Sequence, residues 1–237
     1  MPPDSLLLVD LLRHNAHHFA TQTALRIDGA ALTYAELARR VDAAAAALGS
    51  HVRRGDRVAL WLENSFAWVA SFLALNQLGA TSVPVNTRLT AIETRDILRD
   101  AEARVVVTTQ RYRGRDYHDE LMSAASVDGL GLTAIVASDD RLPNDWPVTT
   151  GSAPASQSSA TLDDLLCIQY TSGTTAVPKG VMLTNRAYLQ TASYVARCQR
   201  LTPHSRFISG APFFHCSGTM HAITVCLVAG CTLDAMS

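Results

Sequence analysis

The most informative segment of this chain is Tyr170-Thr171-Ser172-Gly173-Thr174-Thr175-Ala176-Val177-Pro178-Lys179-Gly180. It concentrates hydroxyl side chains, glycine and a lysine in one short stretch. Small residues leave backbone N–H groups free to bind an anion, and hydroxyls add further donors. The lysine adds a mobile positive charge on a long stem. The composition therefore predicts a loop that binds a polyphosphate.

The flanks of this segment indicate which kind of phosphate loop it is. Residues 165–170 are largely apolar and predict a buried strand, and residues 181–184 predict a second strand. A Walker-type loop reads G-x-x-x-x-G-K-[ST] and opens a helix, whereas here Pro178 precedes Lys179 and a strand follows. The dinucleotide fingerprint G-x-G-x-x-G is absent. The loop is therefore expected to join strand to strand.

Residues 171–180 resemble the signature [ST]-S-G-[ST]-T-G-x-P-K-G of the adenylate-forming family, which includes acyl-CoA synthetases, firefly-type luciferases and peptide-synthetase adenylation domains. Nine of the ten positions match. An exposed Ser/Thr/Gly linker is the alternative, and the order of Pro178, Lys179 and Gly180 argues against it. Ala176 is the one departure, because the family has glycine there. If the backbone at Ala176 needs a positive φ, alanine costs about 1 kcal/mol.

A second block, residues 211–218, resembles the family segment P-x-F-H-x-x-G. The resemblance implies that Phe213, His215 and Gly218 line or gate an acyl pocket. An imidazole can hydrogen-bond a carboxylate or act as an aromatic gate. The alternative is a packed or surface histidine beside a helix start, and the phosphate-loop signature upstream favours the pocket.

The rest of the chain alternates predicted strands and helices, which indicates an α/β fold with helices on both faces of a sheet. The resemblance makes this the layered β-α-β architecture of the acyl-CoA synthetase N-terminal domain, truncated before the C-terminal subdomains. The segment 138–164 is rich in Ser, Asp, Pro, Gly and Thr and predicts an exposed connection or a subdomain boundary. The expected strands are 24–27, 30–32, 57–62, 81–85, 104–108, 133–137, 206–209 and 230–233, and the expected helices are 6–19, 34–48, 66–78, 91–101, 185–200 and 217–229.

Local signals predict several helix ends. Thr33 with Glu36, and Thr90 with Glu93, have capping-box spacing. Asn64 or Ser65 is expected to cap the helix that Gly79 ends. Asn185 is expected to cap a later helix. That helix is predicted to have one face formed by Tyr188, Thr191, Val195 and Cys198.

Composition excludes several classes of protein. The 237 residues are 48% hydrophobic with a net charge of −1, enough for a core and too neutral for an electrostatic nucleic-acid binder. The N-terminus lacks the basic region of a secretory signal, and the longest apolar stretch, residues 222–231, is too short to span a bilayer. Five cysteines without a C-x-x-C pair predict free, mostly buried thiols and no metal site. We expect a soluble cytoplasmic protein that binds no nucleic acid and has no integral membrane segment.

The resemblance implies an ATP-dependent acid–thiol ligase. In the family reaction a carboxylate attacks the α-phosphate of ATP to give acyl-AMP and pyrophosphate. A thiol, usually coenzyme A, then attacks the acyl-AMP to give the thioester and AMP. The residues expected to bind the ATP phosphates with Mg²⁺ are Thr171, Ser172, Gly173, Thr174, Thr175, Lys179 and Gly180, and Thr171 would also close the preceding strand. The resemblance implies a small-molecule carboxylic acid as the substrate, and the aromatic residues around His215 favour a fatty or other apolar acid.

The family's later signals, a Y-G-x-T-E block, a T-G-D segment and the C-terminal small domain, are absent. Residues 1–237 are therefore expected to be the N-terminal part of an AMP-binding domain, without a complete set of catalytic residues and inactive alone. A complementing C-terminal polypeptide and a homodimer are both open. The alternative functions are a non-catalytic fragment that binds a nucleotide or a partner, and the adenylation domain of another branch of the family.

Overall fold

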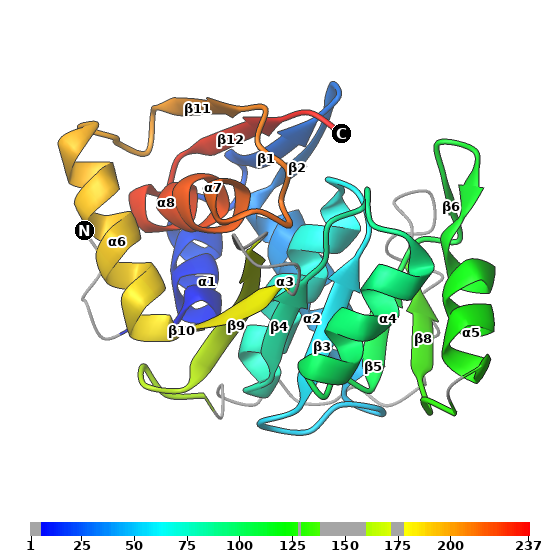
Figure 1. The fold of residues 1–237 in the computed structure, drawn as a ribbon. Helices are drawn as coiled ribbons and strands as arrows, with labels where there is room; N and C mark the ends of the chain where they lie inside the picture. Colours follow the sequence, from blue (N-terminus) through cyan, green and yellow to red (C-terminus); the bar gives the residue numbers. More distant parts are fainter. Residues whose placement is uncertain (1–5, 128, 138–159, 172–177) are drawn as a thin grey trace.

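The computed structural model describes residues 6–127, 129–137, 160–171 and 178–237. Its largest sheet has the strand order β10-β9-β4-β3-β5-β8 (Figure 1). The adjacent strands β9, β4, β3, β5 and β8 are parallel to one another, and β10 pairs antiparallel with β9. The strand bounds are Arg57–Trp61 (β3), Thr81–Pro84 (β4), Val105–Thr108 (β5), Thr133–Val136 (β8), Leu165–Thr171 (β9) and Lys179–Thr184 (β10).

The order of the parallel strands creates a switch point in this sheet. The chain runs from β3 to β4 on one side and then crosses back to β5 on the other side of β3. The carboxyl ends of parallel strands lie at the same edge, and ligands of doubly wound sheets bind at that edge beside the switch point. The fold therefore predicts a binding site just after β3, β4 and β5.

Helices cover both faces of this sheet. Alternate residues of β3 face opposite ways, so that Val58 and Leu60 join one buried cluster while Ala59 and Trp61 join another. Helix α3 (Phe66–Leu78) belongs to the first cluster, and α4 (Ala91–Asp100) and α5 (Tyr117–Val127) contribute to the second. This confirms the α/β fold with helices on both faces.

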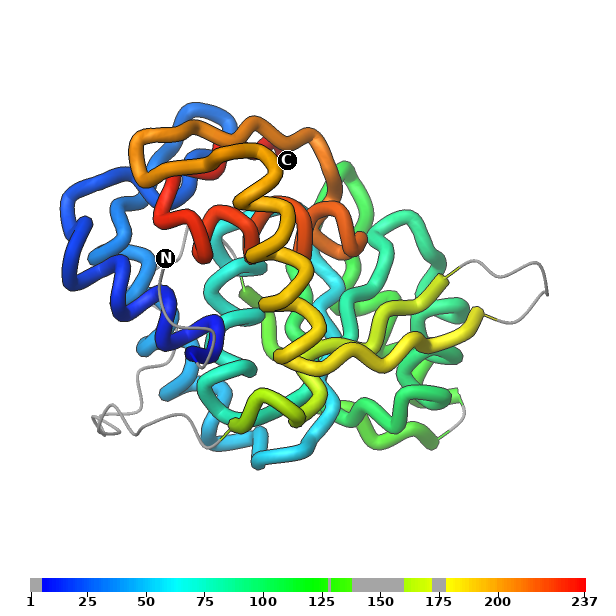
Figure 2. The backbone as a smooth tube through the Cα atoms, turned by 90° about the vertical axis from the view of Figure 1, so that its left-hand side faces the viewer, coloured from blue at the N-terminus to red at the C-terminus, as the bar shows by residue number. Residues whose placement is uncertain are grey.

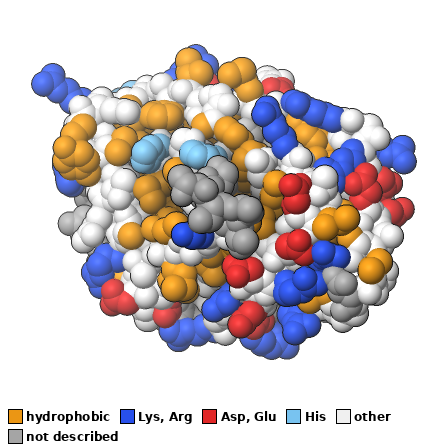
Figure 3. All heavy atoms as spheres, in the orientation of Figure 1, with side chains coloured by type: hydrophobic (Ala, Val, Ile, Leu, Met, Phe, Trp, Pro, Cys, Tyr) orange, Lys and Arg blue, Asp and Glu red, His pale blue; other side chains and the backbone are white. Residues whose placement is uncertain are grey.

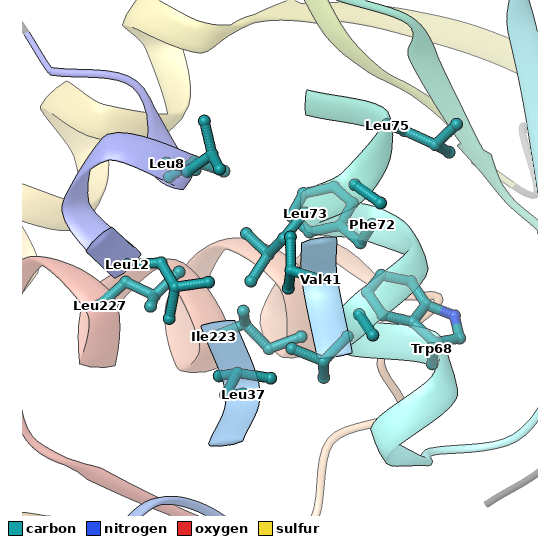
Figure 4. Close-up of a cluster of buried hydrophobic side chains, with 14 of the residues drawn as sticks. Leu8, Leu12, Leu37, Val41, Trp68, Phe72, Leu73, Leu75, Ile223 and Leu227 are labelled. Atoms are coloured by element: carbon teal, nitrogen blue, oxygen red, sulfur yellow. The ribbon is translucent and has the colours of Figure 1, made fainter. Parts of the chain in front are cut away.

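Helix α3 is the centre of the main core. It is apolar on all sides and nearly all of it is buried, which is typical of a helix enclosed by other elements. Figure 4 shows Trp68, Phe72 and Leu73 of α3 facing side chains from three other helices. These helices are α1 (Leu8–His18), α2 (Tyr34–Leu48) and α8 (Val225–Ala229), with the π-helical turn Thr219–Thr224 before α8.

A second sheet joins the two ends of the described chain. Its order is β11-β12-β1-β2, with the antiparallel hairpin β1–β2 and parallel pairs β1–β12 and β11–β12. Asp234 of β12 accepts from Arg26 of β1 (3.2 Å) and from Arg206 of β11 (2.5 Å), which ties the three strands together. The bounds are Thr23–Ile27 (β1), Ala30–Thr33 (β2), Arg206–Ser209 (β11) and Thr232–Ala235 (β12).

The predicted helix ends are mostly confirmed. Thr33–Glu36 and Thr90–Glu93 form capping boxes, and Ser65 rather than Asn64 caps α3. Gly79 ends α3 with φ 70°, a conformation that favours glycine. The cysteines are free as predicted, and three of the five are buried. Figure 3 shows acidic and basic side chains interspersed on one face, in keeping with a net charge near zero.

Two predictions for the helix that begins at Asn185 are wrong: its N-cap and its buried side. Thr184 is the N-cap of α6 (Asn185–Cys198), and its hydroxyl accepts from the Ala187 N–H (3.2 Å). The buried side of α6 consists of Asn185, Tyr188, Leu189, Ala192 and Ala196, and Cys198 is exposed. The predicted residues have helical spacing, but their face is rotated about the helix axis relative to the buried side. The alanines Ala192 and Ala196 mark that side only weakly, because alanine gives no strong hydrophobic signal.

Two other regions differ from the sequence predictions. Residues 217–229 are helical but divided into α7 (Cys216–Gly218), the π-helical turn and α8, with Thr224 Oγ1 donating to the Thr219 carbonyl (2.8 Å). The ribbon β6–β7 (Arg111–Tyr112 and Arg115–Asp116) and helix α5 were not predicted at all. Most of the predicted connection 138–164 lies outside the described residues.

Candidate active site

The strands that flank the predicted phosphate loop form an antiparallel hairpin. Lys179 pairs with Thr171 and Gly180 with Tyr170, which confirms the prediction that the loop joins strand to strand. Figure 2 shows β9 and β10 side by side at the edge of the molecule. Thr171 and Lys179 are exposed at the mouth of the hairpin, while Ser172, Gly173, Thr174 and Thr175 lie outside the described residues. Lys179 is the only lysine in the sequence.

Tyr170 fastens this hairpin to the sheet. Its hydroxyl donates to Asp100 Oδ2 at the end of α4 (2.5 Å). Burial raises the pKa of Tyr170 well above its ordinary value, with the Asp100 carboxylate adding to the effect, so the phenol remains a neutral donor. A Cβ on Gly180 would lie 2.8 Å from Ile168 Cγ2 and 3.1 Å from Tyr170 Cζ. Glycine at position 180 therefore leaves the space that the Tyr170 ring fills.

A cleft of about 350 Å³ opens at the carboxyl ends of β3, β4 and β5, the place that the strand order predicts. Its lining combines polar groups with aromatic surface. Tyr112 and Arg113 come from the β6–β7 ribbon, and Tyr117 opens α5. The residues around it are Glu63, Asn64, Asn86, Thr87, Arg88, Tyr112, Arg113, Tyr117, Gly210, Pro212, Phe214, Met236 and Ser237.

Asn64 holds one wall of the cleft together. Its Oδ1 accepts from the Phe213 N–H (2.6 Å), and its Nδ2 donates to the carbonyls of Ala211 (3.1 Å) and Met236 (2.8 Å). One side chain thus joins the end of β3 to the segment after β11 and to the end of β12. From the sequence, Asn64 was expected only as a possible helix cap. The available signal was an asparagine three positions beyond the end of β3, at the sheet edge where doubly wound folds bind ligands.

Tyr117 supports the opposite wall. Its hydroxyl donates to the Thr87 carbonyl (2.7 Å), and burial raises its pKa. The ribbon that precedes it turns through Arg113 (φ 50°) and Gly114 (φ 79°), the two positive φ values of a tight hairpin turn. Arginine is unusual at the first of these positions, which explains why the sequence did not indicate a hairpin here.

The predicted acyl-pocket residues have different surroundings. Phe213 is fully buried, with its ring centre 5.6 Å from that of Trp68 in the main core, while the half-buried Phe214 lines the cleft. His215 is exposed at the N-cap of α7, and its Nδ1 lies 2.7 Å from Ser217 Oγ and accepts from the Ser217 N–H (3.2 Å). That bond leaves Nε2 as the protonated nitrogen of the neutral ring.

Gly218 is required by a close approach of two backbone segments. A Cβ at this position would lie 2.2 Å from the Pro212 carbonyl oxygen and 2.7 Å from Phe213 Cα. The Gly218 N–H donates to the His215 carbonyl (2.8 Å). The glycine therefore lets the turn fold back on itself and fixes where Phe214 and His215 point.

Gln169 connects the phosphate-loop hairpin to the cleft wall. It precedes Tyr170 on β9 and is buried, and its Nε2 donates to the Phe214 carbonyl (2.8 Å). This bond joins the strand that leads into the predicted phosphate loop to the segment that precedes His215, 45 positions further along the chain.

Comparison with known proteins shows the family to which the chain belongs. The AMP-binding enzyme family model matches residues 12–237. The 3-[(3aS,4S,7aS)-7a-methyl-1,5-dioxo-octahydro-1H-inden-4-yl]propanoyl:CoA ligase of Rhodococcus jostii (strain RHA1) is 34% identical over 240 residues, which cover 95% of this chain and 47% of that protein. The chain belongs to the AMP-binding enzyme family. It spans about half the length of this curated relative.

Solved structures show the same fold. The inhibitor-bound N-terminal domain of FACL13 from Mycobacterium tuberculosis superposes with a TM-score of 0.81 at 26% identity, covering 97% of this chain and 57% of that one. The anthranilate CoA ligase AuaEII in complex with anthranoyl-AMP gives 0.82 at 28% identity, covering 98% and 45%. Among the described residues, no helix combines the length and apolarity that a membrane span requires.

Proposed function

We propose that this chain is the nucleotide- and acid-binding part of an AMP-forming acyl-CoA ligase. The observation that supports the proposal is the Gln169–Phe214 hydrogen bond, which joins the strand leading into the predicted phosphate loop to a residue that lines a cleft with aromatic surface. The chain's similarity to CoA ligases supports the reaction class.

In this proposal the two parts of the site have separate roles. Lys179 and the donors of the loop, Ser172 to Thr175, hold the β- and γ-phosphates of ATP, and Mg²⁺ arrives with the triphosphate. Thr171 and Gly180 fix the ends of the loop. Lys179 would stabilise the phosphate charge and would not act as a base.

The acid would enter through the cleft. Phe214, Tyr112 and Met236 give it apolar surface, which suits a fatty or aromatic acid. His215 would gate the entrance or hydrogen-bond the carboxylate, with Gly218 setting its position. The buried Phe213 would support this wall from behind. Coenzyme A would be the thiol that accepts the acyl group.

Residues 1–237 would form the N-terminal part of the AMP-binding domain, with a subdomain connection at 138–164. Catalysis would then need further polypeptide, either continuous with this chain or supplied by a partner. The chain's match to only about half of a full-length relative favours this arrangement. It also favours a second candidate, a fragment that binds a nucleotide without catalysing a reaction.

The single lysine makes ATP binding directly testable. Limited acetylation of the chain should modify Lys179 and the terminal amine only, and both products are separable by mass spectrometry. We expect ATP with Mg²⁺ to slow acetylation of Lys179 several-fold and to leave the terminal amine unchanged. Equal rates with and without ATP would exclude nucleotide binding at this loop.

ATP–pyrophosphate exchange separates the two candidates. The chain is assayed with a panel of aliphatic and aromatic acids, alone and joined to the missing portion of a relative. Exchange only in the joined protein supports the ligase proposal with an incomplete chain. Protection of Lys179 by ATP without exchange in either form supports the binding fragment.

A further inference from the structure

Helix α1 carries a pair of histidines outside the site described above. Its buried side consists of Leu8, Val9, Leu11, Leu12 and Asn15. His14 and His18 lie away from this side, one helical turn apart, and their ring centres are 4.4 Å apart with the planes tilted by 52°. The His17 ring meets His18 edge-on at 4.8 Å.

We propose that His14 and His18 bind one divalent transition-metal ion, each through one imidazole nitrogen. Zinc–nitrogen bonds are about 2.1 Å long, so two nitrogens on a tetrahedral ion lie about 3.4 Å apart. Rings whose centres are 4.4 Å apart can meet that spacing by rotation about their side-chain bonds. Histidines separated by four positions on a helix are also the spacing of paired zinc ligands in H-E-x-x-H helices.

The helix is held rigidly enough to present the pair. Asn15, between the two histidines, is buried and its Nδ2 donates to the Leu227 carbonyl of α8 (2.8 Å). The Val9 N–H donates to Asn76 Oδ1 of α3 (3.1 Å). Because both turns are anchored, ion binding would require side-chain rotation only, without ordering a flexible segment.

The position on the helix also favours a cation. His18 is the last residue of α1, where the carbonyl groups without intrahelical partners give the helix its negative end. A bound cation there would be attracted to that end, as protonated histidines are at other helix C-termini.

The donor set indicates which ions would bind. Imidazole suits Zn²⁺, Ni²⁺ and Cu²⁺, whereas Mg²⁺ and Ca²⁺ prefer oxygen ligands. No group of three His, Cys, Asp or Glu side chains able to share an ion occurs in the described parts of the chain. Water would therefore complete the coordination, and the site would be weaker than a four-ligand structural zinc site.

The test uses the 237-residue chain without an affinity tag, titrated with Ni²⁺ or Zn²⁺ by calorimetry and with Cu²⁺ by electron paramagnetic resonance. We expect one ion per chain and a copper spectrum with two nitrogen ligands. His14→Gln and His18→Gln should each weaken binding at least tenfold. His17→Gln and His51→Gln, the matched controls, should change it less than twofold, and Mg²⁺ should not compete.

A thermal measurement gives an independent readout. A ligand that binds only the folded state raises the melting temperature with its concentration. Zn²⁺ should therefore raise the melting temperature of the wild type and of His17→Gln but not of His14→Gln. Binding that survives in both His14→Gln and His18→Gln, or that is lost equally in His17→Gln, would overturn the proposal. Neither result bears on ATP binding at the phosphate loop.

Discussion

The side chain of Gln169 donates from Nε2 to the carbonyl oxygen of Phe214 at 2.8 Å, and this bond joins the two halves of the candidate site. Gln169 stands on β9 just before the phosphate-loop segment, and Phe214 lines the cleft. Within the part of the chain that the structure describes, Gln169 Oε1 is buried and finds no hydrogen-bond partner. The amide therefore serves this connection and gains little elsewhere.

Replacing Gln169 by methionine should weaken ATP binding more than it weakens the fold. The change leaves the Phe214 carbonyl without this hydrogen bond, which costs about 1 kcal/mol of stability. It also removes the buried Oε1 that has no partner, which offsets part of that cost. The free energy of unfolding should therefore change by less than about 1 kcal/mol. ATP protection of Lys179 should fall several-fold. Gln199→Met, at the exposed end of α6, is the control and should alter neither. Unchanged protection in Gln169→Met would contradict the role assigned to this bond.

Glu36 should make stability depend on pH in the acid range. The Thr33 N–H and hydroxyl both donate to Glu36 Oε2 at 2.8 Å, and these bonds, the backbone one first, lower its pKa below the ordinary 4.5. A lowered carboxyl pKa means that ionised Glu36 stabilises the fold above about pH 4.5 and that this contribution is lost as the pH falls through the folded-state pKa.

Thermal melting at several pH values checks this dependence. The difference in melting temperature between the wild type and Glu36→Gln should be largest at pH 7 and should shrink by pH 3. Glu102→Gln, a change at an exposed carboxylate, is the control for the loss of a negative charge. A difference between wild type and Glu36→Gln that stays constant from pH 7 to pH 3 would rule out the ionised capping box as its source.

Gly218→Ala should destabilise the protein clearly. The added methyl group would meet the backbone of Pro212 and Phe213, which cannot move as easily as a flexible side chain. Overpacking of this kind costs about 1–3 kcal/mol, which corresponds to roughly 2–12 °C in melting temperature for a chain of this length. Gly131→Ala is the matched control, because a Cβ there meets nothing within 4 Å. Equal melting temperatures for the two variants would show that the 211–218 turn tolerates a side chain at position 218.

Tyr170 and Asp100 should show energetic coupling. A double-mutant cycle with Tyr170→Phe and Asp100→Asn isolates their hydrogen bond from the other effects of each change. We expect a coupling energy of about 1 kcal/mol in chemical denaturation, because the bond involves a carboxylate but is partly open to solvent. ATP protection of Lys179 should also weaken in Tyr170→Phe, since the hairpin loses its anchor on α4. Additive effects of the two changes on stability would count against this anchor.

Much of the fold was predictable because its signals are local. The capping boxes of Thr33 and Thr90, the positive φ of Gly79 and the apolar strand 105–107 each depend on residues within a few positions of one another. The β6–β7 ribbon was missed because its two strands are too short to show alternation, and its turn places an arginine where glycine or asparagine is usual.

The sequence by itself determined the strand–loop–strand form of the phosphate segment and the α/β class, since both follow from local composition and hydrophobic periodicity. Tertiary structure alone decided what the side-chain amides do that bind distant segments. Asn64 binds the 211–213 segment, and Asn185 accepts from Asn76 Nδ2 (2.7 Å) 109 positions away instead of capping its own helix. An amide can donate and accept in many directions, so its partners depend on which distant backbone the fold brings near. The packing of distant elements likewise distinguishes two neighbouring phenylalanines. Phe213 is buried against Trp68, whereas Phe214 lines the cleft.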